Sequence, residues 1–360
     1  MVNKNIGKSL IANVLIIVLI IGSFSSINLD ERSTSSQLFE DNLDDQTKMF
    51  SQRNSNDWSS SASAANPAVL ISVESSTNNE VVVAGIISGS TTMSLGSQSI
   101  TSSQNIEPWI AKGDANGNWQ WIQKVTVTGT SSYAEVDIAD ISVAPNGDIF
   151  ATGRFYESIS FGSISLTSTG YYDTWVAKLS ANGQWVWAEA LRGNGDYDGT
   201  LVTSIDWIQS TSITTDSNNA VTIGGFFLGN TDAGNSGDGI NGNQLDLNDA
   251  EIFVAKYSNS GFSEWIDDAR GQGFQVVNSM VADNSNNVWI STTFEVSMTF
   301  GTVTANAGIN EVPIGLAKIS SSGIWQSAYA TSGSGNSLVT GIDVDSQNNL
   351  YMSGSFSGSV

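Results

Sequence analysis

The sequence lacks cysteine and histidine, and it contains few charged residues. None of the 360 residues is Cys or His, which excludes Cys and Ser-His-Asp nucleophiles, His acid–base catalysis and Cys/His zinc sites. A disulfide framework is excluded for the same reason, so the fold must depend on its core and its β ladders. Only 13% of the residues are charged and 40% are hydrophobic. This composition favours strands and tight turns over exposed helices.

Basic residues are scarce relative to acidic ones. Lys and Arg number 13 against 35 Asp and Glu, which gives a net charge of -22. An acidic surface of this kind repels the phosphates of nucleic acids and anionic lipid headgroups. We therefore expect no nucleic-acid partner. The charge would suit cations or a salty medium, but solubility alone explains it without any partner.

The first 28 residues have the pattern of an export signal. Lys4 and Lys8 precede an apolar run from Leu10 to Ile21, and small residues follow from Gly22. The alternative is an uncleaved membrane anchor, because residues 9–27 are just long enough to span a bilayer. Both alternatives predict an extracellular or cell-surface protein. Residues 29–67 are rich in Ser, Asn and Asp and are predicted to be a linker.

Five segments from residue 68 onward share one pattern. Each contains a polar turn followed by a β run that ends in Gly or Thr, and these end positions recur every 62–72 residues. The segments are expected at about 68–124, 136–191, 208–269, 276–330 and 339–360, the last being partial. The end positions of the β runs are Gly85, Gly153, Gly225, Thr292 and Gly354.

A second recurring feature is a strand that ends in Ala-Lys, followed by a turn glycine and then by a strand containing Trp. Glycine between two β runs is a hairpin signal, because it adopts positive φ without strain. The lysines are Lys112, Lys178, Lys256 and Lys318. The turn glycines are Gly117, Gly183, Gly261 and Gly323, and the tryptophans include Trp121, Trp187 and Trp265.

Together these features give four strands per repeat. The first strand is a short run before the polar turn, and three of these turns begin with Asp (Asp216, Asp283 and Asp345). An extra hairpin between the second and third strands is marked by Phe161-Gly162 and its equivalents. Serial four-stranded repeats predict an all-β fold, a β-propeller of antiparallel blades with about four and a half blades present. Another stacked β array is the alternative.

The repeats resemble the seven-bladed β-propeller repeat family, abbreviated SBBP. The best match is the second repeat, with Gly147-Asp148-Ile149-Phe150-Ala151-Thr152-Gly153, the Phe161-Gly162 turn and Trp175-Val176-Ala177-Lys178. The resemblance covers roughly 68–360, departing at an insertion over 230–249 and at Gly315. It implies an exported propeller and supplies no catalytic residues. Since the fifth repeat is interrupted, we expect the natural protein to continue for about two or three more blades.

Residues that could carry chemistry mostly follow the repeat. Eight of the 11 tryptophans are in register with it, which favours packing over sugar binding. Trp207 lies outside those positions and is the better ligand candidate. The recurring lysines are interpreted as structural, reaching a carboxylate or turn carbonyls of their own or the next blade. The alternative is a ring of cations around an anion site.

Acidic residues offer only weak candidates for a metal site. Asp232, Asp238, Asp246 and Asp249 lie in a segment rich in Gly and Asn, which could supply oxygen ligands to calcium. No established calcium-loop motif is present, and the segment from Asp114 to Asn118 occupies a hairpin-turn position. A solvated loop is therefore favoured over a calcium site, and no other cofactor is expected.

The sequence favours a non-enzymatic exported scaffold that binds proteins or glycans at the cell surface. One alternative is a hydrolase or lyase acting on polysaccharide through two carboxylates in the propeller channel, but no spacing selects a pair. Another is a calcium-dependent adhesion module. Contact with a membrane is expected only through the N-terminal segment.

Overall fold

The computed structural model describes only β-strands and the turns between them. The described residues are 62–64, 68–76, 78–102, 106–169, 171–193, 207–228, 230–232, 239–241, 250–306, 313–331 and 337–356. Within these ranges there is no helix, and hence none that is long and apolar enough to cross a membrane. The predicted signal or anchor, residues 1–28, lies outside the described residues.

The repeating unit is a sheet of four antiparallel strands in chain order, which we call a blade. Each blade has an inner strand, two middle strands and an outer strand. The first comprises β2 (Ala68–Ser75), β3 (Val81–Ser88), β6 (Ile106–Gly113) and β7 (Trp119–Lys124). The second comprises β10 (Asp140–Val143), β11 (Ile149–Tyr156), β14 (Asp173–Leu179) and β15 (Trp185–Gly193).

The third and fourth blades share one long strand. The third contains β16 (Trp207–Thr215), β17 (Val221–Leu228), β20 (Glu251–Tyr257) and the first part of β21 (Ser263–Ala282). After register shifts at Gly271/Gln272 and Gln272/Val276, β21 becomes the inner strand of the fourth blade. That blade continues with β22 (Val288–Phe300), β24 (Ile314–Ile319) and β25 (Trp325–Ala330). The fifth unit has β26 (Ser337–Val344) and β27 (Leu350–Phe356).

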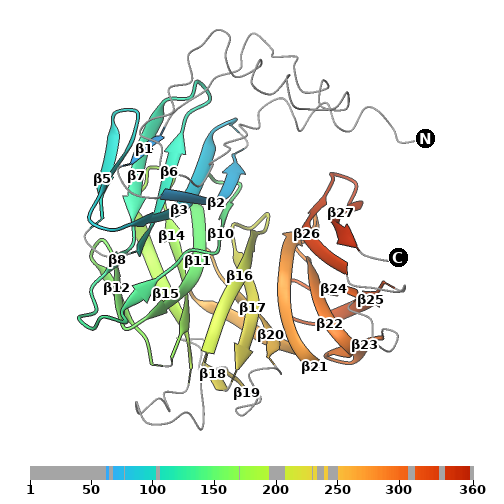
Figure 1. Ribbon diagram of the computed structural model, residues 1–360. Helices are drawn as coiled ribbons and strands as arrows, with labels where there is room; N and C mark the ends of the chain where they lie inside the picture. The colour runs from blue at the N-terminus through green and yellow to red at the C-terminus, as the bar shows by residue number, and fades with distance from the viewer. Residues whose placement is uncertain are drawn as a thin grey trace, which may run out of the picture.

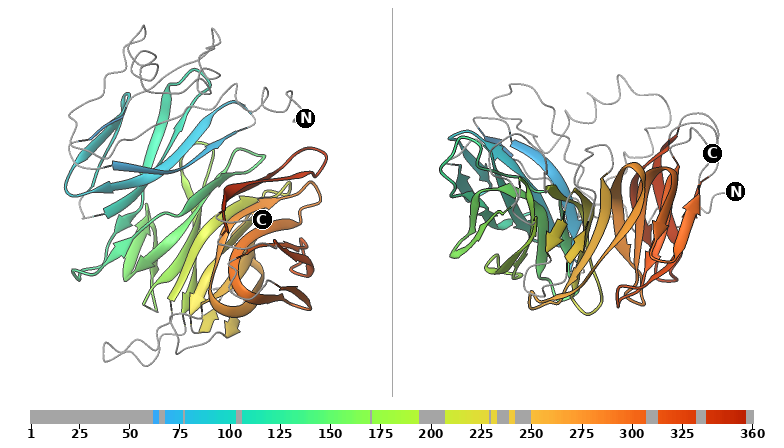
Figure 2. Two further views of the ribbon diagram at one scale, coloured as in Figure 1. Left: turned by 45° about the vertical axis from the view of Figure 1, so that its right-hand side comes forward. Right: turned by 90° about the horizontal axis from the view of Figure 1, so that it is seen from below.

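The sheets stand side by side around a common centre, as the blades of a propeller do (Figures 1 and 2). Successive inner strands contact one another, from β2 through β10, β16 and β21 to β26. The predicted fold class, an all-β propeller of four-stranded antiparallel blades, is confirmed. Figure 1 shows β2 and the β26–β27 pair on the two sides of one opening.

A hairpin between the second and third strands joins each blade to the one before it. The hairpin strand β12 (Ser158–Phe161) pairs with β13 (Ile164–Thr167) and also with β8 (Thr126–Val127), which follows the outer strand of the first blade. Two more hairpins pair with the previous blade in this way. In the hairpin of β18 (Asn230–Asp232) and β19 (Gly239–Asn241), β18 pairs with β15. In the hairpin formed by the end of β22 and β23 (Val303–Asn306), β22 pairs with β21. The chain therefore connects neighbouring blades by hydrogen bonds as well as by packing.

The first hairpin has a partner that the sequence did not predict. It consists of β4 (Thr92–Leu95) and β5 (Gln98–Thr101), and β4 pairs with β1 (Ala62–Ala64). Residues 62–64 fall in the stretch predicted to be a linker. Their small side chains carry no β pattern, so only the pairing with β4 reveals the strand.

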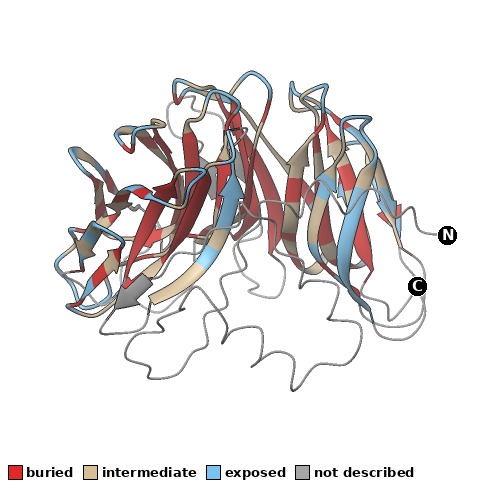
Figure 3. Ribbon diagram, turned by 90° about the horizontal axis from the view of Figure 1, so that it is seen from above, coloured by how far each residue is buried: buried red, intermediate tan, exposed pale blue. Residues whose placement is uncertain are grey.

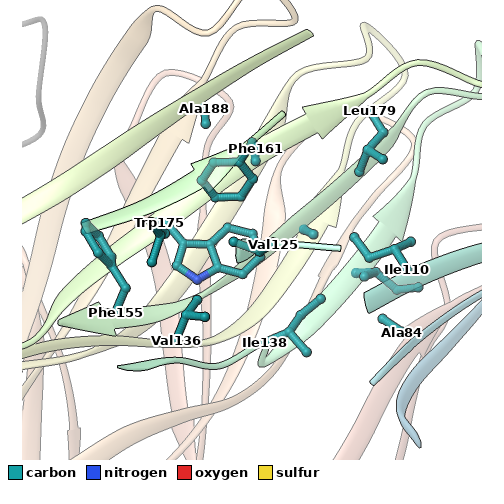
Figure 4. Packing of buried hydrophobic residues seen from close by; sticks show 14 of the residues in the cluster. Ala84, Ile110, Val125, Val136, Ile138, Phe155, Phe161, Trp175, Leu179 and Ala188 are labelled. Atoms are coloured by element: carbon teal, nitrogen blue, oxygen red, sulfur yellow. The ribbon is translucent and has the colours of Figure 1, made fainter. Parts of the chain in front are cut away.

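Both faces of the middle strands are buried between blades, which explains their continuous apolar runs. Every residue of β14 and of β17 is buried. Between the first two blades, Trp175 and Phe161 pack with Ile110 and Ala84 (Figure 4). The strands that border the opening are less buried than the middle strands. Most residues of β27 and half of those of β2 are exposed (Figure 3).

Candidate functional site

The recurring lysines form ion pairs within their own blades. In each pair the carboxylate belongs to the turn between the inner and second strands. The four pairs are Lys112–Glu80 at 2.9 Å, Lys178–Asp148 at 2.7 Å, Lys256–Asp216 at 2.8 Å and Lys318–Asp283 at 2.7 Å. The lysine charges are thus neutralised locally, as the structural interpretation of these residues predicts. They do not form a ring of unpaired cations around an anion.

Three of these lysines and three of the in-register tryptophans also bond to the next blade. Trp121 Nε1 and Lys112 Nζ both donate to the Ala181 carbonyl, each at 3.2 Å. Trp187 Nε1 donates to the Asn259 carbonyl at 3.1 Å, and Trp265 Nε1 to the Ser321 carbonyl at 3.0 Å. We call this arrangement the clasp: a Trp and a Lys of one blade bonded to the third-to-fourth strand turn of the next.

The turn glycines are required by the clasp. Gly183 has a φ of 78° and lies directly against Trp121, so that a Cβ at this position would come within 2.6 Å of the indole ring. Gly261 and Gly323 have φ of 90° and 81° and meet Trp187 and Trp265 in the same way. A side chain at these turns would both strain the backbone and displace the tryptophan.

The inner strands are tied together by small polar residues at one repeat position. These residues are Ser72, Asp140, Ser212 and Ser279, and the fifth unit has Gly341 at this position. Met280 N donates to Ser212 Oγ at 3.1 Å and Ile342 N to Ser279 Oγ at 3.2 Å, so each bond crosses to the next blade. Asp140 accepts from Ser72 Oγ at 2.8 Å on one side and from Ile213 N at 3.2 Å on the other. Through these hydrogen bonds Asp140 links its own inner strand to the inner strands of the first and third blades.

Glu74, on the inner strand β2, is a carboxyl group with a perturbed pKa. The protein surrounding it disfavours its ionised form, and the charges of Asp140 and Asp343 add to this effect, so that the pKa of Glu74 rises to about 7. Its side chain is nevertheless exposed to solvent, because β2 borders the opening. Glu74 and Asp343 occupy equivalent positions of the first and fifth units.

A cluster of aromatic rings around an arginine lies where the second blade meets the third. The guanidinium of Arg154 stacks 4.5 Å above the Tyr172 ring and lies 5.9 Å from the Trp207 ring. Tyr171 contacts Tyr172 with ring centroids 4.5 Å apart, and Tyr156 lies 6.2 Å from Tyr172. We call Arg154, Tyr156, Tyr171, Tyr172 and Trp207 the arginine–aromatic cluster. All five side chains are partly exposed.

Acidic neighbours fix the orientation of Arg154. Its Nε donates to Asp137 Oδ2 at 2.8 Å, and its Nη1 donates to Gln209 Oε1 at 3.2 Å. Glu135, in β9 (Glu135–Val136), lies 3.9 Å from the guanidinium. Burial and a hydrogen bond to Glu135 raise the pKa of Tyr172 above its usual range. The cluster therefore presents an oriented guanidinium and several aromatic rings, which suit stacking and hydrogen bonding.

The sequence singled out one member of this cluster and missed the others. Trp207, named as the better ligand candidate, lies in the cluster, and its buried Nε1 has no hydrogen-bond partner among the described residues. Tyr171 and Tyr172 stand directly before the third strand, yet nothing in their spacing indicated Arg154 as a partner. A search for aromatic residues at blade junctions could have found them.

The structure does not describe a ligand arrangement for the four aspartates that were weak candidates for a metal site. Asp232 lies in β18, and Asp238, Asp246 and Asp249 lie outside the described residues. In the described part of the chain, no group of three or more acidic residues could hold a metal ion. Asp114 accepts hydrogen bonds from the backbone N–H groups of Asn116 and Asn118, each at 2.9 Å, and so closes its own turn. The calcium site stays a prediction.

The sequence also missed a recurring buried acid in the third strand. Glu107, Asp173 and Glu251 stand two residues before the aromatic residue of that strand, and all three are buried. Asp173 accepts from Gly193 N at 2.9 Å, Glu251 from Gly271 N at 3.2 Å, and Glu107 pairs with Lys124 at 2.9 Å. The partners all lie near the end of the outer strand, so these acids position that strand.

Comparisons with known proteins support a repeat protein without giving a family. No family model matches the chain. An uncharacterized WD repeat-containing protein of Acanthamoeba polyphaga mimivirus is 26% identical over 239 residues, which is 58% of this chain but only 16% of that protein. A catalytically inactive virginiamycin B lyase from Staphylococcus aureus, solved with quinupristin, aligns over 82% of this chain and 96% of its own at 11% identity. Its TM-score of 0.23 is too low to carry an argument.

Proposed function

We propose that the chain is an exported propeller scaffold that binds a protein partner through the arginine–aromatic cluster. The observation that carries this proposal is the composition of the cluster: three Tyr, one Trp and one oriented Arg, all partly exposed. Tyr, Trp and Arg are the residue types enriched at the energetic centres of protein interfaces. The similarity to a WD repeat-containing protein agrees with an interaction role.

Export follows from the N-terminal pattern rather than from the fold. The basic residues and apolar run before residue 22 support a cell-surface or secreted protein, and the absence of Cys places no demand on the redox environment. The resemblance to SBBP repeats points the same way. With a net charge of -22, the scaffold favours partners with a basic surface.

A photo-crosslinking amino acid placed at Tyr133 tests the proposed interface. Tyr133 is 77% exposed and lies two residues before Glu135, so it marks the rim of the cluster. The control is the same amino acid at Tyr329, an exposed position in the fourth blade. We expect a discrete protein adduct from position 133 alone. The partner, purified after identification, should bind the Tyr172→Ala variant at least about tenfold more weakly.

Other outcomes would redirect or overturn this proposal. Binding to a glycan array that is lost in Tyr172→Ala, with no protein adduct, would replace the protein partner with a glycan. Equal adducts at both positions, or unchanged affinity of Tyr172→Ala, would contradict the assignment of the cluster as the interface.

A carboxylate-based hydrolase or lyase is a second candidate, favoured by the raised pKa of Glu74 next to Asp140 and Asp343. The hydrogen bonds that already engage Asp140 count against it as the second catalytic group. Release of new ends from a panel of polysaccharides would support this candidate if Glu74→Gln abolished it. Activity that survives the substitution would exclude Glu74 from the chemistry.

A further inference from the structure

The clasp between the second and third blades differs from the other two in the residue that receives it. Ala181 and Ser321 each accept their clasp bonds through the backbone carbonyl. Asn259, the equivalent residue of the third blade, adds a carboxamide to that carbonyl. Lys178 Nζ donates to the Asn259 carbonyl at 3.2 Å and also to the side-chain Oδ1. Among the clasps that the structure describes, only this one brings a lysine amine into contact with an asparagine side chain.

A carboxylate lies on the other side of the same amine. Asp148 Oδ2, from the turn between the inner and second strands of the lysine's own blade, is 2.7 Å from Lys178 Nζ. The carbonyl carbon Cγ of Asn259 is bonded directly to the Oδ1 that Nζ contacts. The lysine therefore stands between a group that can accept a proton and a carbon that an amine can attack.

The contact is shielded from solvent and its partners are held in place. The Lys178 side chain is 7% exposed and that of Asp148 is 17% exposed. Nζ lies 5.6 Å from the centre of the Phe150 ring, and Trp187 fixes the backbone of Asn259 by donating from Nε1 to its carbonyl at 3.1 Å. Two groups that are fixed in contact and shielded from water react far faster than the same groups free in solution.

We propose that Lys178 and Asn259 form an isopeptide bond that links the second blade covalently to the third. Nζ passes one proton to the Asp148 carboxylate and attacks Cγ of Asn259 as a neutral amine. The Nζ–Cγ bond forms and the Cγ–Nδ2 bond breaks, while a second Nζ proton moves to Nδ2, which leaves as ammonia. Asp148 then returns its proton to the ammonia, so the products are an amide and an ammonium ion. The step consumes no oxidant, reductant or other reactant.

The bond supplies a covalent constraint that a chain without cysteine cannot obtain from disulfides. Its two residues lie 81 positions apart in the sequence. Closing a loop of this length restricts the unfolded chain, so we expect the bond to raise Tm by on the order of 10 °C.

Peptide mapping of the purified full-length chain, folded and then denatured for digestion, tests the bond. Trypsin should leave Lys178 uncleaved, and mass spectrometry should find its peptide joined to the peptide of Asn259, lighter than their sum by one ammonia molecule. The matched control is Asn259→Ser, because the chain itself carries Ser at the equivalent position 321 of a complete clasp. This variant should fold, give no joined peptide and melt at a lower temperature. Cleavage at Lys178 and two separate peptides from the folded parent would overturn the proposal.

The next clasp along the chain allows the same chemistry to be introduced. Lys256 Nζ lies 2.8 Å from Asp216 Oδ2, so only the carboxamide is missing there. Ser321→Asn should therefore yield a second joined peptide, which contains Lys256 and position 321. A folded Ser321→Asn protein without that peptide would contradict the mechanism.

The role of Asp148 is tested by Asp148→Asn, which keeps the size of the side chain but removes the proton acceptor. The joined fraction should fall at least about tenfold in this variant. An unchanged fraction would contradict the assignment of Asp148 as the proton acceptor.

Discussion

Two regions of the molecule use the same repeat positions but make different contacts. They are the junction between the second and third blades and the outer strand of the fourth blade. Lys178 and Trp187 both reach the turn of the third blade, and Gly261 lies against the indole ring. In the fourth blade the tryptophan position is Ser327, and Lys318 is 22% exposed against 5% for Lys256. The difference shows that the clasp is a property of two adjacent blades, since one repeat alone cannot form it.

Removing the indole from a complete clasp should have the largest effect. Trp187 lies 5.8 Å from Phe150 and 6.4 Å from Tyr257, between centroids, so Trp187→Ala leaves a cavity between the blades. We expect a loss of about 3–4 kcal/mol in the free energy of unfolding. Ser327→Ala, at the same position of the fourth blade, should change it by less than about 0.5 kcal/mol. Urea denaturation of both variants measures the contrast, which equal losses would refute.

Replacing the lysine should distinguish a blade with a complete clasp, here the third, from the fourth blade by a smaller difference in the free energy of unfolding. In Lys256→Met the Oδ2 atom of the buried Asp216 loses its counter-charge, at a cost of about 2–3 kcal/mol. In Lys318→Met the carboxylate of Asp283 keeps the Asn287 amide at 3.1 Å, so we expect a loss of about 1 kcal/mol. Thermal unfolding at pH 7 compares the pair. A larger loss for Lys318→Met would indicate that the exposed lysine has a partner beyond the described residues.

The smallest expected effect is a pH dependence at Glu74, on the blade that faces the fifth unit. The protein around its carboxyl group and two acidic neighbours raise the pKa of Glu74 from 4.5 to about 7 in the folded protein. Between about pH 5 and 7 the folded state therefore holds a proton that the unfolded chain releases, so stability falls as pH rises through this window. Glu74→Gln should match the parent in Tm at pH 4 and exceed it at pH 8. Parallel Tm curves for parent and variant would show that Glu74 titrates normally.

The strands were predictable from sequence because their signals are local. The turn glycines, the Ala-Lys runs and the Asp residues at turn starts lie within a few positions of the strands that they delimit, so one repeat is enough to recognise the next. The inner ties are less visible, because Ser72, Asp140 and Ser212 share a position but not a residue type. Their common role appears only when Asp140 is seen between its two neighbours.

The candidate site was largely beyond sequence reasoning. Arg154 and Trp207 are separated in the sequence by a hairpin and by the third and outer strands of the second blade. Arg154 also occupies a repeat position that holds Ile86 and Phe226 in other blades. Departure from the repeat was a usable signal for Trp207, since a residue without repeat equivalents is not explained by the common packing. β1 was missed for the opposite reason. Its three small residues follow the repeat only through the register of their partner strand.

The pairing of each hairpin with the previous blade has a consequence for how such a chain can change in length. Because β12, β18 and the end of β22 each extend the sheet behind them, a deletion confined to one hairpin would leave an unprotected sheet edge on its neighbour, open to aggregation. Duplication of a whole repeat would carry both the donor hairpin and the acceptor strand, and would leave every edge covered. Growth and loss by complete repeats are therefore the changes that this architecture tolerates.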